Sequence, residues 1–148
     1  MKLVYGLIDY NDNWQLPIVK FFTANQVVMN SGALVMGAGN AKAARDALPN
    51  VDLKCGKTLK KCKKQVYVVE VTEGQFLGAL ATKKNWKLPS NIDFVVQGLK
   101  ELNKLAKENP EVTYQVPYPA ISNGGLTRAE IDPIVAQLPD NVHLYTTK

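Results

Sequence analysis

The sequence predicts an α/β sandwich in a single domain, and three observations favour this fold class. Short apolar runs fit strands at residues 2–8, 26–29, 65–71, 74–81, 112–116 and 142–145. Helical patterns fall between several of these runs, and this alternation is typical of α/β folds. The 148 residues are 46% hydrophobic, which is enough for one domain with a substantial core. We therefore expect one domain over residues 1–148.

Three helices are expected from their start signals and their apolar faces. The clearest begins at Ser90, because Ser90 and Asp93 have the spacing of a capping box and a long one-sided apolar pattern follows. A second helix should cover about residues 40–48, where a proline ends it. A third should begin near Thr127 or Asp132.

Composition bears on the cellular compartment of the protein and on whether it binds a metal. No apolar run approaches the roughly 20 residues of a membrane span, and the first residues lack the order of a signal peptide. Cys55 and Cys62 do not have the spacing of a zinc site, so we expect reduced thiols and no bound metal or cofactor. These features predict a cytoplasmic protein, and nothing in the sequence demands more than a monomer.

A lysine-rich segment accounts for much of the net charge of +5. Its members are Lys54, Lys57, Lys60, Lys61, Lys63 and Lys64. Such a run is usually a solvated face, and no aromatic residue is interleaved to stack on bases. Two interpretations therefore stay open: a solvated surface, or weak electrostatic binding of nucleic acid.

Two glycine loops are the most informative local features. The first lies within residues 30–45, where an expected strand leads through glycines directly into an expected helix, and the second covers residues 119–126 between a strand and an expected helix. Glycine lets the backbone approach an anion, and the first N–H groups of a helix favour phosphate. Lys42 stands where a dinucleotide-binding loop needs its third glycine, and no Walker lysine motif occurs. The loops thus predict a ligand with two phosphates held at one edge of the sheet.

Four segments of the chain resemble the macrodomains, a family of ADP-ribose-binding α/β proteins. They are residues 28–30, 36–39, 121–126, and the stretch 81–90. The last stretch is similar to a Thr-Lys-x-x-Trp-x-x-Pro-Ser motif. That motif occurs in the branch of terminal ADP-ribose glycohydrolases and of antitoxins that remove ADP-ribose from DNA. The resemblance implies a three-layer α/β/α sandwich with a mixed central sheet, and ADP-ribose or a derivative as ligand.

The resemblance also implies which residues contact that ligand. The expected substrate-binding residues are Asp9, Asn30, Met36, Gly37, Ala38, Gly39, Asn40, Ile121, Ser122, Asn123, Gly124, Gly125 and Leu126. Of these, Asn30 would lie by the distal ribose, and the two glycine loops would enclose the diphosphate. Asp9 would have to replace the usual acidic contact to adenine, because Leu7 stands at the family's aspartate position.

The expected catalytic residue is Lys83, which matches the lysine of the hydrolase branch. A lysine in a partly desolvated cleft can act as a nucleophile or base, or it can sit charged beside a diphosphate. Thr127 stands where these hydrolases carry an acid, so Glu130 or Asp132 would have to take that role.

Three classes of function therefore remain open. The protein is an enzyme that releases ADP-ribose or removes phosphate from ADP-ribose 1''-phosphate, a non-catalytic reader of ADP-ribose, or a basic nucleic-acid-binding domain. The partner expected from the resemblance is ADP-ribose or an ADP-ribosylated macromolecule, and no membrane contact is expected.

Overall fold

The computed structural model describes residues 1–121 and 124–147. Within them a six-stranded sheet has the order β1-β6-β5-β2-β4-β3. Its strands are β1 (Lys2–Tyr5), β2 (Ile18–Ala24), β3 (Val66–Thr72), β4 (Gln75–Ala81), β5 (Thr113–Pro117) and β6 (Val142–Thr146). All neighbours are parallel except β3 and β4, which are antiparallel. The expected mixed sheet is therefore confirmed.

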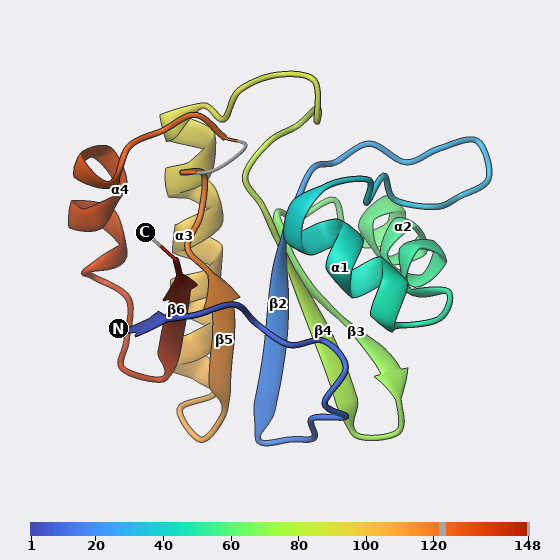
Figure 1. Ribbon diagram of the computed structural model, residues 1–148, viewed down its shortest axis with the longest axis horizontal. Coiled ribbons are helices and arrows are strands. Elements are labelled where there is room, and N and C mark those ends of the chain that lie inside the picture. The colour runs from blue at the N-terminus through green and yellow to red at the C-terminus, as the bar shows by residue number, and fades with distance from the viewer. Residues whose placement is uncertain (122–123, 148) are drawn as a thin grey trace.

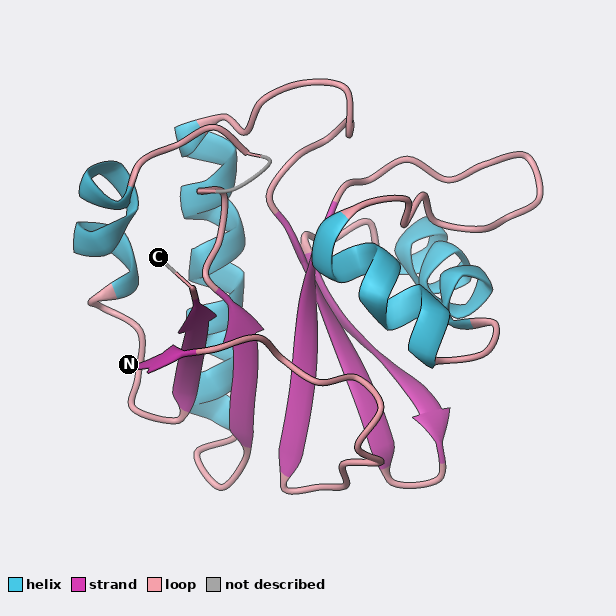
Figure 2. Cartoon of the chain, in the orientation of Figure 1, coloured by secondary structure: helices cyan, strands magenta, loops and turns pink. Residues whose placement is uncertain are grey.

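Helices cover both faces of this sheet (Figures 1 and 2). They are α1 (Gly39–Ala47), α2 (Val51–Cys62), α3 (Ile92–Glu108) and α4 (Arg128–Val135). The buried side chains form two clusters: one unites α1 and α2 with the sheet, and the other unites α3 and α4 with it. The expected α/β/α layering is therefore present.

Alternation along β2 shows how one strand serves both cores. Phe21 belongs to the α3 side and Phe22 to the α1 side, and both are fully buried. Successive strand residues point to opposite faces, and burying each phenyl group contributes about 1.5–3 kcal/mol. Gly78 of β4 makes room for Phe21, since a Cβ at Gly78 would lie 2.2 Å from the Phe21 ring.

The sequence prediction of a strand at residues 26–29 is wrong, and the strand is instead β2. Residues 26–29 form only one isolated bridge, between Val28 and Leu34. Strand β2 was not predicted because Lys20 interrupts its apolar run. Lys20 is nevertheless only 3% exposed, and its Nζ lies 2.5 Å from an Asp12 carboxylate oxygen and 2.5 Å from the Asp9 carbonyl oxygen. A buried charge is tolerated when it is paired in this way.

The helix predictions need two corrections. Helix α2 was not predicted, because its lysines obscure the apolar stripe of Val51, Cys55 and Leu59 that it buries. Helix α3 is capped by Asn91 and not by Ser90, since the Asn91 side chain accepts from the N–H groups of residues 93 and 94. The predicted helix at residues 40–48 corresponds to α1.

The helices were also considered as membrane spans. None in the described part of the chain has the length and apolarity that a bilayer-spanning helix requires.

Candidate functional site

A cleft of about 1050 Å³ opens at the carboxyl ends of the parallel strands. Its walls come from the residues that end or follow β1, β2, β4, β5 and β6, and from the start of α1. Ligands of open α/β sheets bind at this edge, where the loops after the strands meet. Among the described residues that line it there is no aspartate or glutamate, whereas Lys83 and Lys87 do line it. The lining therefore suits an anionic ligand.

The first glycine loop brings the N-terminus of α1 into this cleft. Gly37, Ala38, Gly39 and Asn40 all line it. Ala38 is the N-cap, in extended conformation with φ −150°, and no side chain caps the helix there. Gly39 has φ +58°, a left-handed conformation that glycine adopts readily. The first turn of α1 also lacks acidic residues, so its N–H groups and positive dipole end are available to an anion.

Two asparagines fix this loop to the end of β2. Asn40 Oδ1 accepts from the Thr23 backbone N–H at 2.7 Å, and Asn40 Nδ2 donates to Thr23 Oγ1 at 2.9 Å. Asn25 Nδ2 donates to the Val35 carbonyl oxygen at 2.9 Å. These side-chain bonds replace the sheet hydrogen bonds that end with β2, so the loop is held in place without a ligand.

The second glycine loop reaches the cleft through Ile121 and Gly124. The Leu126 N–H donates to the Ala120 carbonyl oxygen at 2.9 Å, which closes the loop. A Cβ at Gly124 would lie 2.4 Å from that same oxygen, so only glycine fits there. Ser122 and Asn123, two of the predicted ligand contacts, lie outside the described residues.

The N-terminus of helix α4, which follows this loop, is capped by side chains of its own first residues. Thr127 Oγ1 accepts from the Glu130 N–H at 3.2 Å, and Glu130 Oε1 accepts from the Thr127 N–H at 3.0 Å. This is a reciprocal capping box. The hydroxyl at position 127 is therefore used as a helix cap, and the Glu130 carboxylate is occupied at the same place.

Asp132 is held by a tyrosine and an arginine. The Tyr118 hydroxyl donates to Asp132 Oδ1, and Arg128 Nε donates to the same oxygen at 2.7 Å. These hydrogen bonds, first from Tyr118 and then from Arg128, lower the pKa of Asp132, while burial and the Asp132 bond raise that of Tyr118. Tyr118 lines the cleft with its proton retained at neutral pH, whereas Asp132 is ionised and does not line it. An ionised, occupied carboxylate is poorly suited to act as a general acid.

The structure divides the predicted site residues into two groups. Those that line the cleft are Gly37, Ala38, Gly39, Asn40, Lys83, Ile121 and Gly124. Described residues that do not line it are Asp9, Asn30, Met36, Gly125 and Leu126. Their proposed contacts with a ligand stay predictions.

Two members of the second group show why sequence alone misplaces side chains. Met36 is 1% exposed and belongs to the core beneath α1, although its neighbours line the cleft. The Asp9 carboxylate accepts from the Asn11 N–H at 2.8 Å, so it is used in a local turn. Leu7, at 83% exposure, lines the cleft instead.

Several lining residues were not predicted from the sequence. Thr23 and Asn25 were not predicted because β2 itself was not recognised. With β2 recognised, polar residues at the end of a strand would have indicated them. Trp86 and Leu88, which are 51% and 60% exposed, border the cleft on the segment after Lys83. Exposed large apolar side chains beside a cleft are typical of ligand contact.

Comparison with known proteins identifies the fold. No protein-family model matches the sequence, and no curated protein matches it. Among solved structures, the macrodomain of Mycobacterium tuberculosis DarG is similar with TM-score 0.72 and 25% identity, over 99% of this chain and 98% of that one. The macrodomain of Thermus aquaticus DarG gives TM-score 0.68 and 22% identity, over 99% and 97% of the two chains.

A third similar structure contains a ligand. Thermosipho africanus DarTG in complex with ADP-ribose gives TM-score 0.69 and 19% identity, over 97% of this chain and 41% of that one. The present chain therefore has the macrodomain fold, and the resemblance indicated by its sequence motifs is confirmed.

Proposed function

We propose that this chain binds ADP-ribose, or an ADP-ribosyl group on a larger molecule, in the cleft at the carboxyl ends of the parallel strands. One observation carries the proposal: the uncapped N-terminus of α1 opens into a cleft whose described lining contains two lysines and no carboxylate. A diphosphate needs such donors and such charge. The cleft, at about 1050 Å³, is also at the upper end of small-molecule sites, as a ligand with two sugars requires.

The roles of the individual residues follow from their positions. The backbone of Gly37, Ala38 and Gly39 would hold the diphosphate together with the first N–H groups of α1. Asn40 would keep this loop in place through Thr23. Ile121 and Gly124 would face the ligand from the opposite loop. The ADP-ribose in the similar DarTG complex supports this choice of ligand.

Calorimetric titration tests the binding proposal, with ADP-ribose as ligand and with ADP and AMP as controls. We expect a Kd of about 10 µM or tighter for ADP-ribose, and weaker binding of ADP and AMP because they lack the distal ribose. Absence of measurable heat at about 1 mM ADP-ribose would contradict the proposal.

Hydrolysis of an ADP-ribosyl linkage is a second candidate, because Lys83 lines the cleft immediately after β4. The opposing observation is that Glu130 and Asp132 both accept hydrogen bonds from neighbouring residues and that neither lines the cleft. Any hydrolysis would thus depend on Lys83 without a carboxylate from the described lining. A purely binding protein would form no product at all.

Substitution of Lys83 separates catalysis from binding. We expect Lys83→Ala to lower any release of ADP-ribose by about 100-fold or more, as for loss of a positioned catalytic group, with a smaller change in affinity. Lys84→Ala is the matched control, because the Lys84 side chain is exposed and its Nζ lies 5.8 Å from the centre of the Phe94 ring, outside the cleft lining. The assay uses ADP-ribosylated macromolecules and ADP-ribose 1''-phosphate as separate substrates. Turnover that survives Lys83→Ala would contradict a catalytic role for this lysine.

A further inference from the structure

The end of helix α2 presents a cluster of cations that the cleft does not use. Its members are Lys57, Lys60, Lys61, Lys63 and Lys64, here called the α2 lysine surface, and all five side chains are exposed. None of them takes part in an ion pair within the described residues. Their five charges equal the net charge of +5 of the whole chain.

Lys54, on the same helix, has a structural role that the α2 lysine surface lacks. Its Nζ donates to the Glu70 and Val71 carbonyl oxygens at 3.1 and 2.8 Å, so it fastens α2 to the end of β3. No such carbonyl contact is found for the α2 lysine surface in the described chain. Lysines near a helix C-terminus also favour the dipole by about 0.3–1 kcal/mol each, but this effect is confined to the last turn. It leaves Lys57 and Lys64 unexplained, since the helix ends at Cys62.

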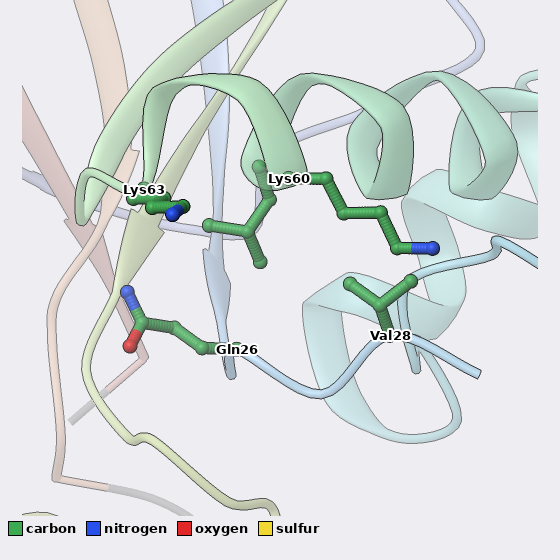
Figure 3. A pocket seen from close by; sticks show the side chains of 5 residues that line it. Gln26, Val28, Lys60 and Lys63 are labelled. Carbon is green, nitrogen blue, oxygen red and sulfur yellow. The ribbon is translucent and has the colours of Figure 1, made fainter. Parts of the chain in front are cut away.

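A groove lies beside this surface (Figure 3). It has a volume of about 270 Å³ and is lined by Gln26, Val28, Leu59, Lys60 and Lys63. Figure 3 shows Lys60 and Lys63 projecting from the end of α2, with Gln26 and Val28 on the opposite side. The groove therefore offers two cations and a side-chain amide along an apolar floor, an arrangement that fits a phosphate group and the sugar attached to it.

The spacing of the lysines favours a polymer of phosphates. Lys57, Lys60 and Lys61 are three and four residues apart, so they lie on one side of α2. Lys63 and Lys64 follow the C-terminus of the helix, where Lys63 is the C-cap. Successive helical turns are about 5.4 Å apart, and each nucleic-acid strand carries a phosphate about every 3.4 Å along the axis. Several lysines can therefore reach neighbouring phosphates at once.

Other anionic partners fit this surface less well. A membrane-surface helix needs a free apolar face, whereas Val51, Cys55 and Leu59 of α2 are buried in the core. Acidic and phosphorylated peptides are typically recognised by arginine clusters, and this surface contains only lysine. The absence of aromatic residues from the lysine segment and from the groove lining also argues against base stacking.

We propose that the α2 lysine surface and its groove bind the sugar-phosphate backbone of a nucleic acid through charge, without reading its sequence. This interaction does not depend on the cleft or on its ligand. Counterions released from the backbone supply the binding free energy, so the affinity falls steeply as salt rises.

Fluorescence anisotropy with labelled 20-nucleotide probes tests the proposal from about 50 to about 200 mM salt. The probes are duplex DNA, single-stranded DNA and RNA, each in two unrelated sequences. For duplex DNA, five lysines on five phosphates predict a slope of log K against log salt of about −4.5, since each neutralised phosphate contributes about −0.9. We expect the two sequences of each probe to bind within about twofold of each other, because backbone contacts carry no sequence information.

Matched triple variants locate the surface. The test variant carries Lys57→Gln, Lys60→Gln and Lys61→Gln on α2, and should reduce the size of the slope to about 2. The control removes the same charge from α3 by substituting three exposed lysines, Lys100, Lys104 and Lys107, with glutamine. The control should keep most of the slope, and both variants should keep the wild-type circular dichroism spectrum and the wild-type affinity for ADP-ribose.

Four outcomes would overturn the proposal. They are no binding of any probe at about 50 mM salt, equal losses in the α2 and α3 variants, equal affinity for polyglutamate or for vesicles of anionic lipid, and a strong preference between the two sequences. Failure of ADP-ribose binding alone would count only against the cleft, because the α2 variant and the nucleic-acid probes are measured separately.

Discussion

The two glycine loops lead into helices whose N-termini are treated in opposite ways. At α1 the N-cap is Ala38, no side chain accepts from the first N–H groups, and the helix start lines the cleft. At α4 the N-cap is Thr127, and a reciprocal capping box with Glu130 satisfies the first turn. Two glycine loops that each lead from a strand into a helix therefore differ in whether the helix start is open to a ligand.

A glycine loop therefore does not by itself define a phosphate site. The residue at the N-cap decides whether the helix donors are used within the protein or remain available. Under the proposed function the diphosphate would lie on the α1 side, whereas the Thr127 hydroxyl caps α4.

Ala38→Asp would convert the open helix start into a capped one. Ala38 already has the extended conformation of an N-cap, so a carboxylate there can accept from the N–H groups of Asn40 or Ala41. We expect unfolding free energy to rise by about 0.5–2 kcal/mol. ADP-ribose affinity should fall by about 100-fold, because charge-assisted donors are lost and a negative charge faces the diphosphate. Thermal melts and calorimetry measure both effects, and full retention of affinity would refute the open-helix assignment.

Gly37→Val places a branched side chain in the open space of the same loop. A Cβ at Gly37 meets no atom within 4 Å and its φ is not left-handed, so the fold should tolerate the change. We expect about a tenfold loss of ADP-ribose affinity from steric exclusion, with Gly37→Ala between Val and wild type. Gly39→Val is a poorer test, since its φ of +58° would strain any branched residue. Unchanged affinity in Gly37→Val would remove Gly37 from the ligand site.

Thr127→Ala is the counterpart at the closed helix. It removes the hydroxyl acceptor for the Glu130 N–H, so the unfolding free energy should fall by about 1 kcal/mol. ADP-ribose affinity should stay within about twofold, because the capped start of α4 is not expected to contact the ligand. Urea denaturation and calorimetry on the same preparation check the two expectations. A loss of affinity without a loss of stability would reverse the roles assigned to the two helices.

Asp132→Asn should produce a small, pH-dependent effect. The pKa of Asp132 is lowered in the folded protein by Tyr118 and then Arg128. Its carboxylate therefore stabilises the fold above its unfolded pKa of about 4, and this contribution disappears as the pH falls through the lower folded value. We expect the wild-type Tm to exceed that of the variant at pH 7, with the gap closing in acid. A gap that stays constant from about pH 7 to about pH 2 would rule out this ion pair as its source.

Most strands were predictable because their local patterns and their sheet contacts agree. Strand β2 is an exception, and among the helices α2 is another, because lysines interrupt their apolar positions. The environment of Lys20 depends on Asp12, eight residues earlier, and a window of hydrophobicity cannot register that partner. Residues 26–29 look like a strand in sequence but do not join the sheet. Their backbone bonds to the neighbouring segment around Leu34 and, at Gln26, to the Lys84 carbonyl oxygen.

Site residues could be predicted where the backbone places them at the cleft, and less well where the direction of the side chain decides whether they reach it. Gly37, Gly39 and Gly124 reach the cleft through the loops that the glycine pattern marked. Met36 turns into the core, a direction that follows from tertiary packing, whereas the Asp9 carboxylate is used in a local turn by the Asn11 N–H. The expected helix start near Thr127 is confirmed, since Thr127 is the N-cap of α4, and Glu130 follows it at capping-box spacing.

Amide chemical shifts during titration with ADP-ribose distinguish the two helix starts, because each start is observed separately. We expect saturable shifts that are largest at the amides of Gly37, Gly39, Asn40 and Ala41. Amides at the start of α4, such as Ala129 and Glu130, should shift far less. The largest shifts at the α4 amides, or no shifts at either helix, would contradict the claim that the uncapped start of α1 is where this protein holds its ligand.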